Sequence, residues 1–286
     1  MSLMNCEGFE QSPIIVFADG PKTLGELSDI EETRAVVKGL LGDRAEYHFN
    51  DTNHGLANSI ISGVSKVLGK FDRVIVIEDD LDFAPTFLVY MNLSLEAYAN
   101  NFSVYQISGY MFDVPELRQD TNALFLPIIN SWGWATWKRA WLQFDSSASG
   151  WEDVKDDRAL RLRFNIGGAY DFSTMLQKQI KGRIDSWAIR WYWSVFKAGG
   201  LTLFPPRTLV NNLGFDGSGS HGRGRFRNFR VSHSNQESFV PNIPEEVRLD
   251  PKIVNRVFAA IYHSNGGWRG KLIDTCRFVF YGFFSR

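Results

Sequence analysis

The fold is decided by Arg73-Val-Ile-Val-Ile-Glu78-Asp79-Asp80, an apolar, mostly β-branched run that ends in three acids. The run lacks polar alternation, which is typical of a central strand covered on both faces. Three adjacent carboxylates repel one another unless a cation neutralises them, and hard divalent ions prefer oxygen ligands. The stretch therefore predicts a buried strand whose end binds Mn²⁺ or Mg²⁺. The alternative is an acidic loop that caps the next helix, because acids favour helix N-termini.

Strand and helix patterns alternate around this stretch. Apolar runs predict strands at 14–18, 46–49, 73–77 and 104–107, and helical spacing predicts helices at 26–41, 55–68 and 86–100. This order is typical of an α/β fold with a parallel sheet, in which ligands bind beyond the carboxyl ends of the strands. Asp19 and the acids at 78–80 both lie at such ends.

The pattern is less regular after residue 107. It predicts strands at 124–129 and 201–204, helices at 134–144, 171–181 and 187–198, and a mobile glycine-rich loop at 214–224. Pro241 and Pro244 indicate a linker. We therefore expect a leader and short N-terminal extension at 1–12, one domain at 13–240 and a C-terminal helical tail at 241–286.

Composition excludes several function classes. The 31 basic and 32 acidic residues give a formal charge of −1, so no general basic field attracts nucleic acid, and no nucleic-acid partner is expected. No window is long and apolar enough to span a bilayer, and no signal peptide is evident. Two cysteines favour a reducing compartment. We expect a cytoplasmic protein, either in solution or bound peripherally at the inner face of the membrane.

Six segments occur in an order that can be matched to a known family. They are Val16–Pro21, Asn53–Ile61, Val74–Asp80 with Pro85 and Phe87, Ser131–Trp137, Ile184–Trp191 and Gly214–His221. Together they resemble bacterial sugar transferases of the GT-A fold, which are distantly similar to N-acetylglucosaminyltransferase I. The resemblance extends over about residues 14–222. It implies a nucleotide-sugar transferase with a central, mainly parallel sheet flanked by helices.

The resemblance also implies roles for residues around the nucleotide. Asp19 is similar to the strand-end acid that faces the base, and Asn53 and Asn58 lie in the segment that flanks the nucleotide pocket. Asp19 and the acids at 78–80 also have a simpler reading, as ordinary polar residues at the ends of strands.

The three acids receive separate roles from the same resemblance. Asp80 is similar to the direct ligand of Mn²⁺ or Mg²⁺, and Asp79 to the acid that holds ribose or sugar hydroxyls. Glu78 resembles an acid that contacts the donor or supports the ligand from behind. Glu-Asp-Asp here replaces the usual Asp-x-Asp.

Asp185 is the candidate catalytic base. Inverting transfer needs a carboxylate that removes the proton of the acceptor hydroxyl as its oxygen attacks the anomeric carbon. Asp185 begins an aromatic run that continues to Trp193, and Asp is also a good N-cap for a helix there. The position within the family favours catalysis, and the two roles are compatible.

The glycine-rich segment 214–221 has two readings of equal weight. As a lid, its backbone N–H groups would cradle a diphosphate, with Ser220 contacting phosphate and His221 contacting the metal. As a plain surface loop, it would bind nothing.

Tryptophans crowd two of the matched segments. A sugar ring stacks its C–H face on an indole, so Trp132 and the adjoining Gly133 are expected to line the sugar pocket, whereas Trp134 and Trp137 are expected in the core. Both readings stay open for Trp187, Trp191 and Trp193.

Two basic, aromatic segments remain. Residues 221–230 hold four Arg and two Phe, a pattern that suits single-stranded nucleic acid, a phosphate-rich donor or an anionic lipid-linked acceptor. Residues 268–286 form either a peripheral membrane contact or a helix packed on the domain.

The chain departs from the family at its start. Only about a dozen residues precede the strand at 14–18, so the first β–α unit of a GT-A sheet is expected to be missing, which bears on donor affinity. We expect an inverting glycosyltransferase that moves a sugar, from UDP by preference, to a glycan or lipid-linked acceptor in surface polysaccharide assembly. The alternatives are a non-catalytic nucleotide- or glycan-binding module, and a membrane or nucleic-acid binder acting through the Arg-rich segment.

Overall fold

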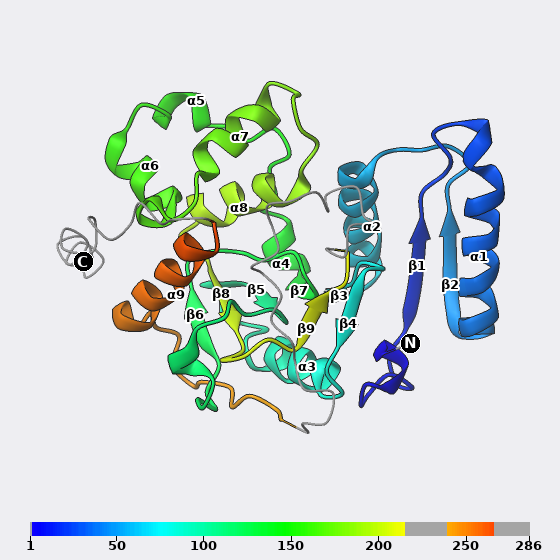
Figure 1. The fold of residues 1–286 in the computed structure, drawn as a ribbon, viewed down its shortest axis with the longest axis horizontal. Coiled ribbons are helices and arrows are strands. Elements are labelled where there is room, and N and C mark those ends of the chain that lie inside the picture. Colours follow the sequence, from blue (N-terminus) through cyan, green and yellow to red (C-terminus); the bar gives the residue numbers. More distant parts are fainter. Residues whose placement is uncertain (1, 215–238, 266–286) are drawn as a thin grey trace.

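A computed structural model of the chain describes residues 2–214 and 239–265, which form a mixed α/β fold (Figure 1). The strands are β1 (Ile14–Ala18), β2 (Ala45–Phe49), β3 (Arg73–Val76), β4 (Leu81–Phe83), β5 (Val104–Ser108), β6 (Leu124–Leu126), β7 (Trp134–Trp137), β8 (Leu201–Phe204) and β9 (Val210–Asn212). The α-helices are α1 (Leu27–Leu41), α2 (Leu56–Lys70), α3 (Phe87–Ala97), α4 (Lys138–Trp141), α5 (Trp151–Val154), α6 (Arg158–Phe164), α7 (Phe172–Ile180), α8 (Trp187–Lys197) and α9 (Pro251–Ser264). The α/β class is thereby confirmed.

The central sheet has five strands in the order β3-β7-β5-β8-β6. Strand β7 is antiparallel to both of its neighbours, β6 is antiparallel to β8, and β5 is parallel to β8. The expectation of a mainly parallel sheet is therefore wrong for this part of the chain. The cause is the segment 134–137, which was expected to begin a helix but forms a strand between β3 and β5.

The mixed sheet keeps one edge suitable for a site. Because β7 is antiparallel to β3 and to β5, those two strands run in the same direction, and β8 is parallel to β5. The carboxyl ends of β3, β5 and β8 therefore meet the start of β7 at one edge of the sheet. Ligands bind at such an edge in open α/β sheets.

Strands β1 and β2 form a separate parallel pair. Helix α2 packs on both β1 and β3: Gly63 faces the ring of Phe17, and Ile60 and Ile61 pack in the cluster that holds Val76. In Figure 1 the blue β1, β2 and α1 stand beside α2 at one side of the molecule. The described residues place no strand between β1 and β3, and the missing first unit stays a prediction.

Strands β4 and β9 pair as a short antiparallel ribbon, with Leu81 opposite Asn212 and Phe83 opposite Val210. The sequence predicted neither strand, because each has only three residues and β9 contains two asparagines, which are poor strand formers. The ribbon brings residues 212–214 beside the acids that follow β3.

The core is rich in aromatic side chains. Helix α3 packs on the sheet through Phe87, Tyr90 and Met91, and α9 buries one face of its own against α8 and the 166–176 region. A third cluster contains the indoles of Trp134 and Trp187, whose ring centroids lie 5.0 Å apart. The core reading is confirmed for Trp134 and Trp137, and the remaining tryptophans of the open group are also buried: Trp187, Trp191 and Trp193. Within the described ranges, no helix has the length and apolarity needed to cross a bilayer.

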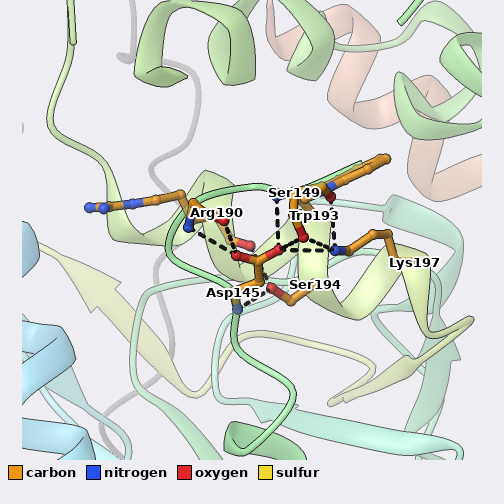
Figure 2. A network of polar contacts seen from close by, with 7 residues as sticks. Asp145, Ser149, Arg190, Trp193, Ser194 and Lys197 are labelled. Atoms are coloured by element: carbon orange, nitrogen blue, oxygen red, sulfur yellow. Dashed lines mark hydrogen bonds and ion pairs between the residues drawn. The ribbon is translucent and has the colours of Figure 1, made fainter. Parts of the chain in front are cut away.

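A polar network centred on Asp145 joins α8 to the loop between α4 and α5 (Figure 2). The Asp145 carboxylate accepts hydrogen bonds from the backbone N–H and hydroxyl groups of Ser147 and Ser149, and from Nζ of Lys197 at 3.1 Å. The backbone N–H of Asp145 donates to the hydroxyl of Ser194 at 2.9 Å. Burial raises the pKa of Asp145, but these hydrogen bonds outweigh burial and hold the pKa well below its usual range.

We expect Asp145→Ala to lower the free energy of unfolding by about 2 kcal/mol at pH 7, because hydrogen bonds to a charged group contribute about that much. Since the folded pKa is lowered, the contribution is fully present above the unfolded pKa, begins to decline as pH falls below about 4 and is lost only as pH falls through the lowered folded pKa. Urea unfolding at pH 7 and pH 3 measures the difference from wild type. An equal difference at both pH values would contradict the account.

Candidate functional site

The acids that follow β3 leave the sheet next to the start of β7. Val76 pairs with Trp134 in antiparallel register, so residues 78–80 follow β3 on the side where Trp132 and Gly133 lead into β7. The ribbon of β4 and β9 begins immediately afterwards, at Leu81. Three segments far apart in the sequence therefore converge on this carboxylate cluster, defined as Glu78, Asp79 and Asp80.

Burial, followed by the charges of neighbouring acids, disfavours the ionised forms of Glu78 and Asp80. Burial raises the pKa of Glu78 to about 7, with further increases from the negative charges of Asp80 and Asp79. Burial also raises the pKa of Asp80; a hydrogen bond from Asn212 opposes this shift, and the charge of Asp79 adds to it. The ionised forms of Glu78 and Asp80 are thus disfavoured, and a bound cation would reverse that preference.

Asp80 has the geometry that a metal ligand needs. Its Oδ1 is buried and has no hydrogen-bond partner in the described part of the chain, a condition that a bound ion explains. Its other carboxylate contacts come from β9, so the unpartnered oxygen fits Mn²⁺ or Mg²⁺. Across residues 2–214 and 239–265 no group of three or more His, Cys, Asp or Glu forms a ready-made metal site. The fit therefore rests on one protein oxygen, with a diphosphate as the source of further ligands.

We expect Glu78→Gln to stabilise the metal-free protein above neutral pH. A raised folded pKa gives stability that is present below the unfolded pKa near 4.5 and is lost as pH rises through about 7. At 1.36 kcal/mol per pKa unit, the shift is equivalent to roughly 3 kcal/mol in the free energy of unfolding. Urea unfolding from pH 4.5 to 8 in EDTA measures it.

The matched control for that series is Glu96→Gln, because Glu96 is an exposed acid that pairs with Arg73. The control should follow the wild-type pH profile. A Glu78→Gln profile parallel to wild type would show that the Glu78 carboxyl is not held protonated by its surroundings.

Asp19 organises the loops that follow β1 and β2. Its carboxylate accepts hydrogen bonds from the backbone N–H groups of His54 at 2.9 Å and Gly55 at 2.9 Å, from that of Gly20, and from the amide of Asn50. Burial raises the pKa of Asp19, and these hydrogen bonds together reverse that shift and lower it. The carboxylate thus fixes the approach to the first turn of α2. Its predicted contact with a nucleotide base stays a prediction.

Asn53 and Asn58 lie in the same region. The amide of Asn53 donates to the carbonyl of Gly20 at 3.1 Å, which joins the loops after β1 and β2, and Asn58 donates to the carbonyl of His54 at 3.0 Å. The structure therefore brings Asp19, Asn53 and Asn58 together around the N-terminus of α2.

Asp185 lies at the same helix end. Its Oδ2 accepts from the backbone N–H of Ala57 at 3.4 Å, and its Oδ1 lies 3.5 Å from Nη2 of Arg190. Both contacts are long, and 55% of the side chain is exposed. The expectation that Asp185 caps its own helix is wrong: Ser186 is the N-cap of α8, and its hydroxyl accepts from the N–H of Ile189. The Asp185 carboxylate is left largely open to solvent.

Trp132 and Gly133 differ in what they offer a ligand. Trp132 is partly exposed, and its ring meets Tyr110 edge-on with centroids 4.6 Å apart. Gly133 is buried with φ of +55°, and a Cβ there would lie 2.9 Å from Val210. The glycine is therefore required by packing, whereas the expected contact of the Trp132 indole with a sugar ring stays a prediction.

Several expected contacts lie outside the described residues. These are Ser220 and His221 of the glycine-rich segment, the Arg-rich residues 221–230 and the basic, aromatic residues 268–286. Their predicted roles stay predictions.

Sequence reasoning missed three residues that the fold adds. Asn212 and Gly214 reach Asp80 from β9, and Arg190 reaches Asp185 from within α8. Arg190 follows Asp185 by only five residues, so this contact could have been predicted from the sequence. The Asn212 contact was not, because it depends on the pairing of β4 with β9.

Comparison with known proteins adds no assignment. A scan against models of protein families gives no match, and a search among curated proteins also gives none. The function is therefore argued from the residues and their geometry.

Proposed function

We propose that the protein is a metal-dependent, inverting glycosyltransferase that takes a sugar from a nucleotide diphosphate, UDP by preference, and transfers it to an acceptor hydroxyl. One observation carries the proposal: the buried Oδ1 of Asp80 lacks a partner among the described residues and belongs to three mutually repelling carboxylates at the sheet edge. Such a site is stabilised by a divalent cation, and a diphosphate supplies ligands that the described residues do not.

In this proposal Asp80 holds Mn²⁺ or Mg²⁺ through Oδ1. When bound, the metal supplies positive charge that stabilises the departing nucleoside diphosphate. Exposed Asp79 hydrogen-bonds ribose or sugar hydroxyls, and Glu78 lies behind them in a buried position. The indole of Trp132 offers a face to the sugar.

Asp185 acts as the general base on the acceptor side. An exposed carboxylate with only long contacts has lone pairs free to accept the proton of an acceptor hydroxyl. Arg190 pairs with Oδ1 and so leaves Oδ2 as the basic oxygen. The N–H of Ala57 helps to orient Oδ2 at the start of α2.

The GT-A fold belongs to the same proposal. The α/β class, the order from β1 to β3 and the acids at the carboxyl ends of strands support it. The acceptor is a glycan or lipid-linked sugar of surface polysaccharide assembly. A peripheral membrane location through residues 268–286 would bring the chain to such an acceptor.

A donor-binding panel tests the proposal. Thermal unfolding is followed with UDP-, GDP- and dTDP-sugars, each with and without Mn²⁺. We expect one nucleotide-sugar class to raise the melting temperature by several degrees only when Mn²⁺ is present, because a ligand at a hundred times its Kd contributes about 2.7 kcal/mol. Stabilisation by no nucleotide in either condition would contradict a donor site.

A non-catalytic binding module is the second candidate. It is favoured by the separation of the β1–β2 pair from the five-stranded sheet, which leaves the loop of Asp19 unsupported by strand pairing to β3. This candidate predicts metal-dependent nucleotide binding in the panel with no release of nucleoside diphosphate from the donor.

A further inference from the structure

The end of β9 holds Asp80 through both backbone and side chain. The N–H of Leu213 donates to the carbonyl of Asp80 at 2.7 Å, which continues the ribbon of β4 and β9 past its last pair. The side chain of Asn212 donates a hydrogen bond to the Asp80 carboxylate. Asp80 is therefore held in place by a segment that lies about 130 residues later in the sequence.

The contacts of Asp80 distinguish its two carboxylate oxygens. Oδ1 has no partner in the described part of the structure, whereas Oδ2 is the oxygen that lies against Gly214. The Oδ1 atom of Asn212 accepts from the N–H of Gly214 at 2.8 Å, which turns the amide nitrogen towards Asp80. Contacts thus run from Gly214 through Asn212 to the carboxylate of Asp80.

Gly214 leaves the space that this arrangement needs. A Cβ at Gly214 would lie 2.6 Å from Oδ2 of Asp80 and 3.2 Å from Oδ1 of Asn212. The first distance is shorter than real Cβ contacts allow, so the carboxylate or the backbone would have to move. The φ angle of Gly214 lies outside the left-handed region, so among the described residues the obstacle to alanine is contact with the Asp80 carboxylate and, less closely, with Asn212.

We propose that Asn212 and Gly214 are positioning residues for Asp80: they hold its carboxylate and leave Oδ1 directed at a divalent cation. The inference rests on the proposed function, since it explains how the metal ligand found among the described residues is held in place. Residues that orient a ligand from behind typically change metal affinity 10- to 100-fold when altered. Neither residue is assigned contact with the metal or the sugar.

Manganese binding tests the inference without requiring turnover. Free Mn²⁺ is titrated by electron paramagnetic resonance with the wild-type protein and UDP, and then with Gly214→Ala, Asn212→Ser and Asp80→Asn. We expect Gly214→Ala and Asn212→Ser to weaken Mn²⁺ binding at least about tenfold and Asp80→Asn to abolish it. Gly39→Ala is the matched control, because a Cβ at exposed Gly39 in α1 meets nothing within 4 Å.

Each result has a separate meaning. Unchanged Mn²⁺ affinity in both Gly214→Ala and Asn212→Ser, with binding lost in Asp80→Asn, would overturn the inference and leave the proposed function standing. Absence of Mn²⁺ binding in the wild type would overturn both. Thermal melting of each variant shows that the titrated protein is folded, and if Gly214→Ala fails to fold, Asn212→Ser decides the question.

Discussion

Asp185→Asn should lower kcat for sugar transfer roughly a thousandfold, the scale expected when a general base is removed. Asparagine keeps the shape of the side chain and its contact with Ala57, but it cannot accept the proton of an acceptor hydroxyl. The fold should survive, because 55% of the Asp185 side chain is exposed and its contacts lie at 3.4 and 3.5 Å. Donor binding should persist, so the loss should appear in kcat and not in the KM for the donor.

Asp113→Asn is the matched control for this variant. Asp113 also pairs with an arginine five residues later, Arg118, and is similarly exposed, but it belongs to none of the matched segments. Its kcat should equal that of wild type. Steady-state kinetics with melting curves for the three proteins decide the matter, and near-normal turnover by Asp185→Asn would remove this residue from the mechanism.

Asp80→Asn should abolish Mn²⁺ binding and with it metal-dependent turnover. The neutral amide cannot balance the charge of the cation, and it removes the oxygen that lacks a partner within the described ranges. The same change removes one of the two negative charges that raise the pKa of Glu78, although burial, the larger cause, remains. The protein itself should become slightly more stable without metal, since the repulsion decreases.

The control for Asp80→Asn is Asp72→Asn, an exposed acid just before β3. It should bind Mn²⁺ like wild type in calorimetric titration and should not change the melting temperature by more than about a degree, as expected for a surface substitution. Wild-type Mn²⁺ affinity in folded Asp80→Asn would place the metal elsewhere.

Local patterns predicted the first half of the fold well. The strand at 14–18 has the bounds of β1, and the strand at 73–77 ends one residue later than β3, because continuous β-branched runs are a local signal. The segment 134–137 failed because Trp-Ala-Thr-Trp is compatible with helix or strand until β3 and β5 are beside it. This strand and β6, which is antiparallel to β8, make the sheet mixed where a mainly parallel one was expected.

In the site, too, local features could be predicted from the sequence and long-range contacts could not. A run of acids at a strand end is visible in the sequence, and the fold places Glu78 in a buried position that raises its pKa. Asn212 and Gly214 gave no such signal, because their role exists only once β9 pairs with β4. Asp185 was expected to cap α8, but Ser186 is the N-cap. The prediction missed by one residue, because the exact start of a helix is uncertain by one or two residues.

The most direct test of the central claim is the release of nucleoside diphosphate from a UDP-sugar, followed with and without Mn²⁺ in wild type and Asp80→Asn. The account predicts release by the wild type with Mn²⁺, none after EDTA, and none by folded Asp80→Asn in either condition. Release that persists without metal, or equally in Asp80→Asn, would contradict a metal-dependent transferase centred on the acids that end β3.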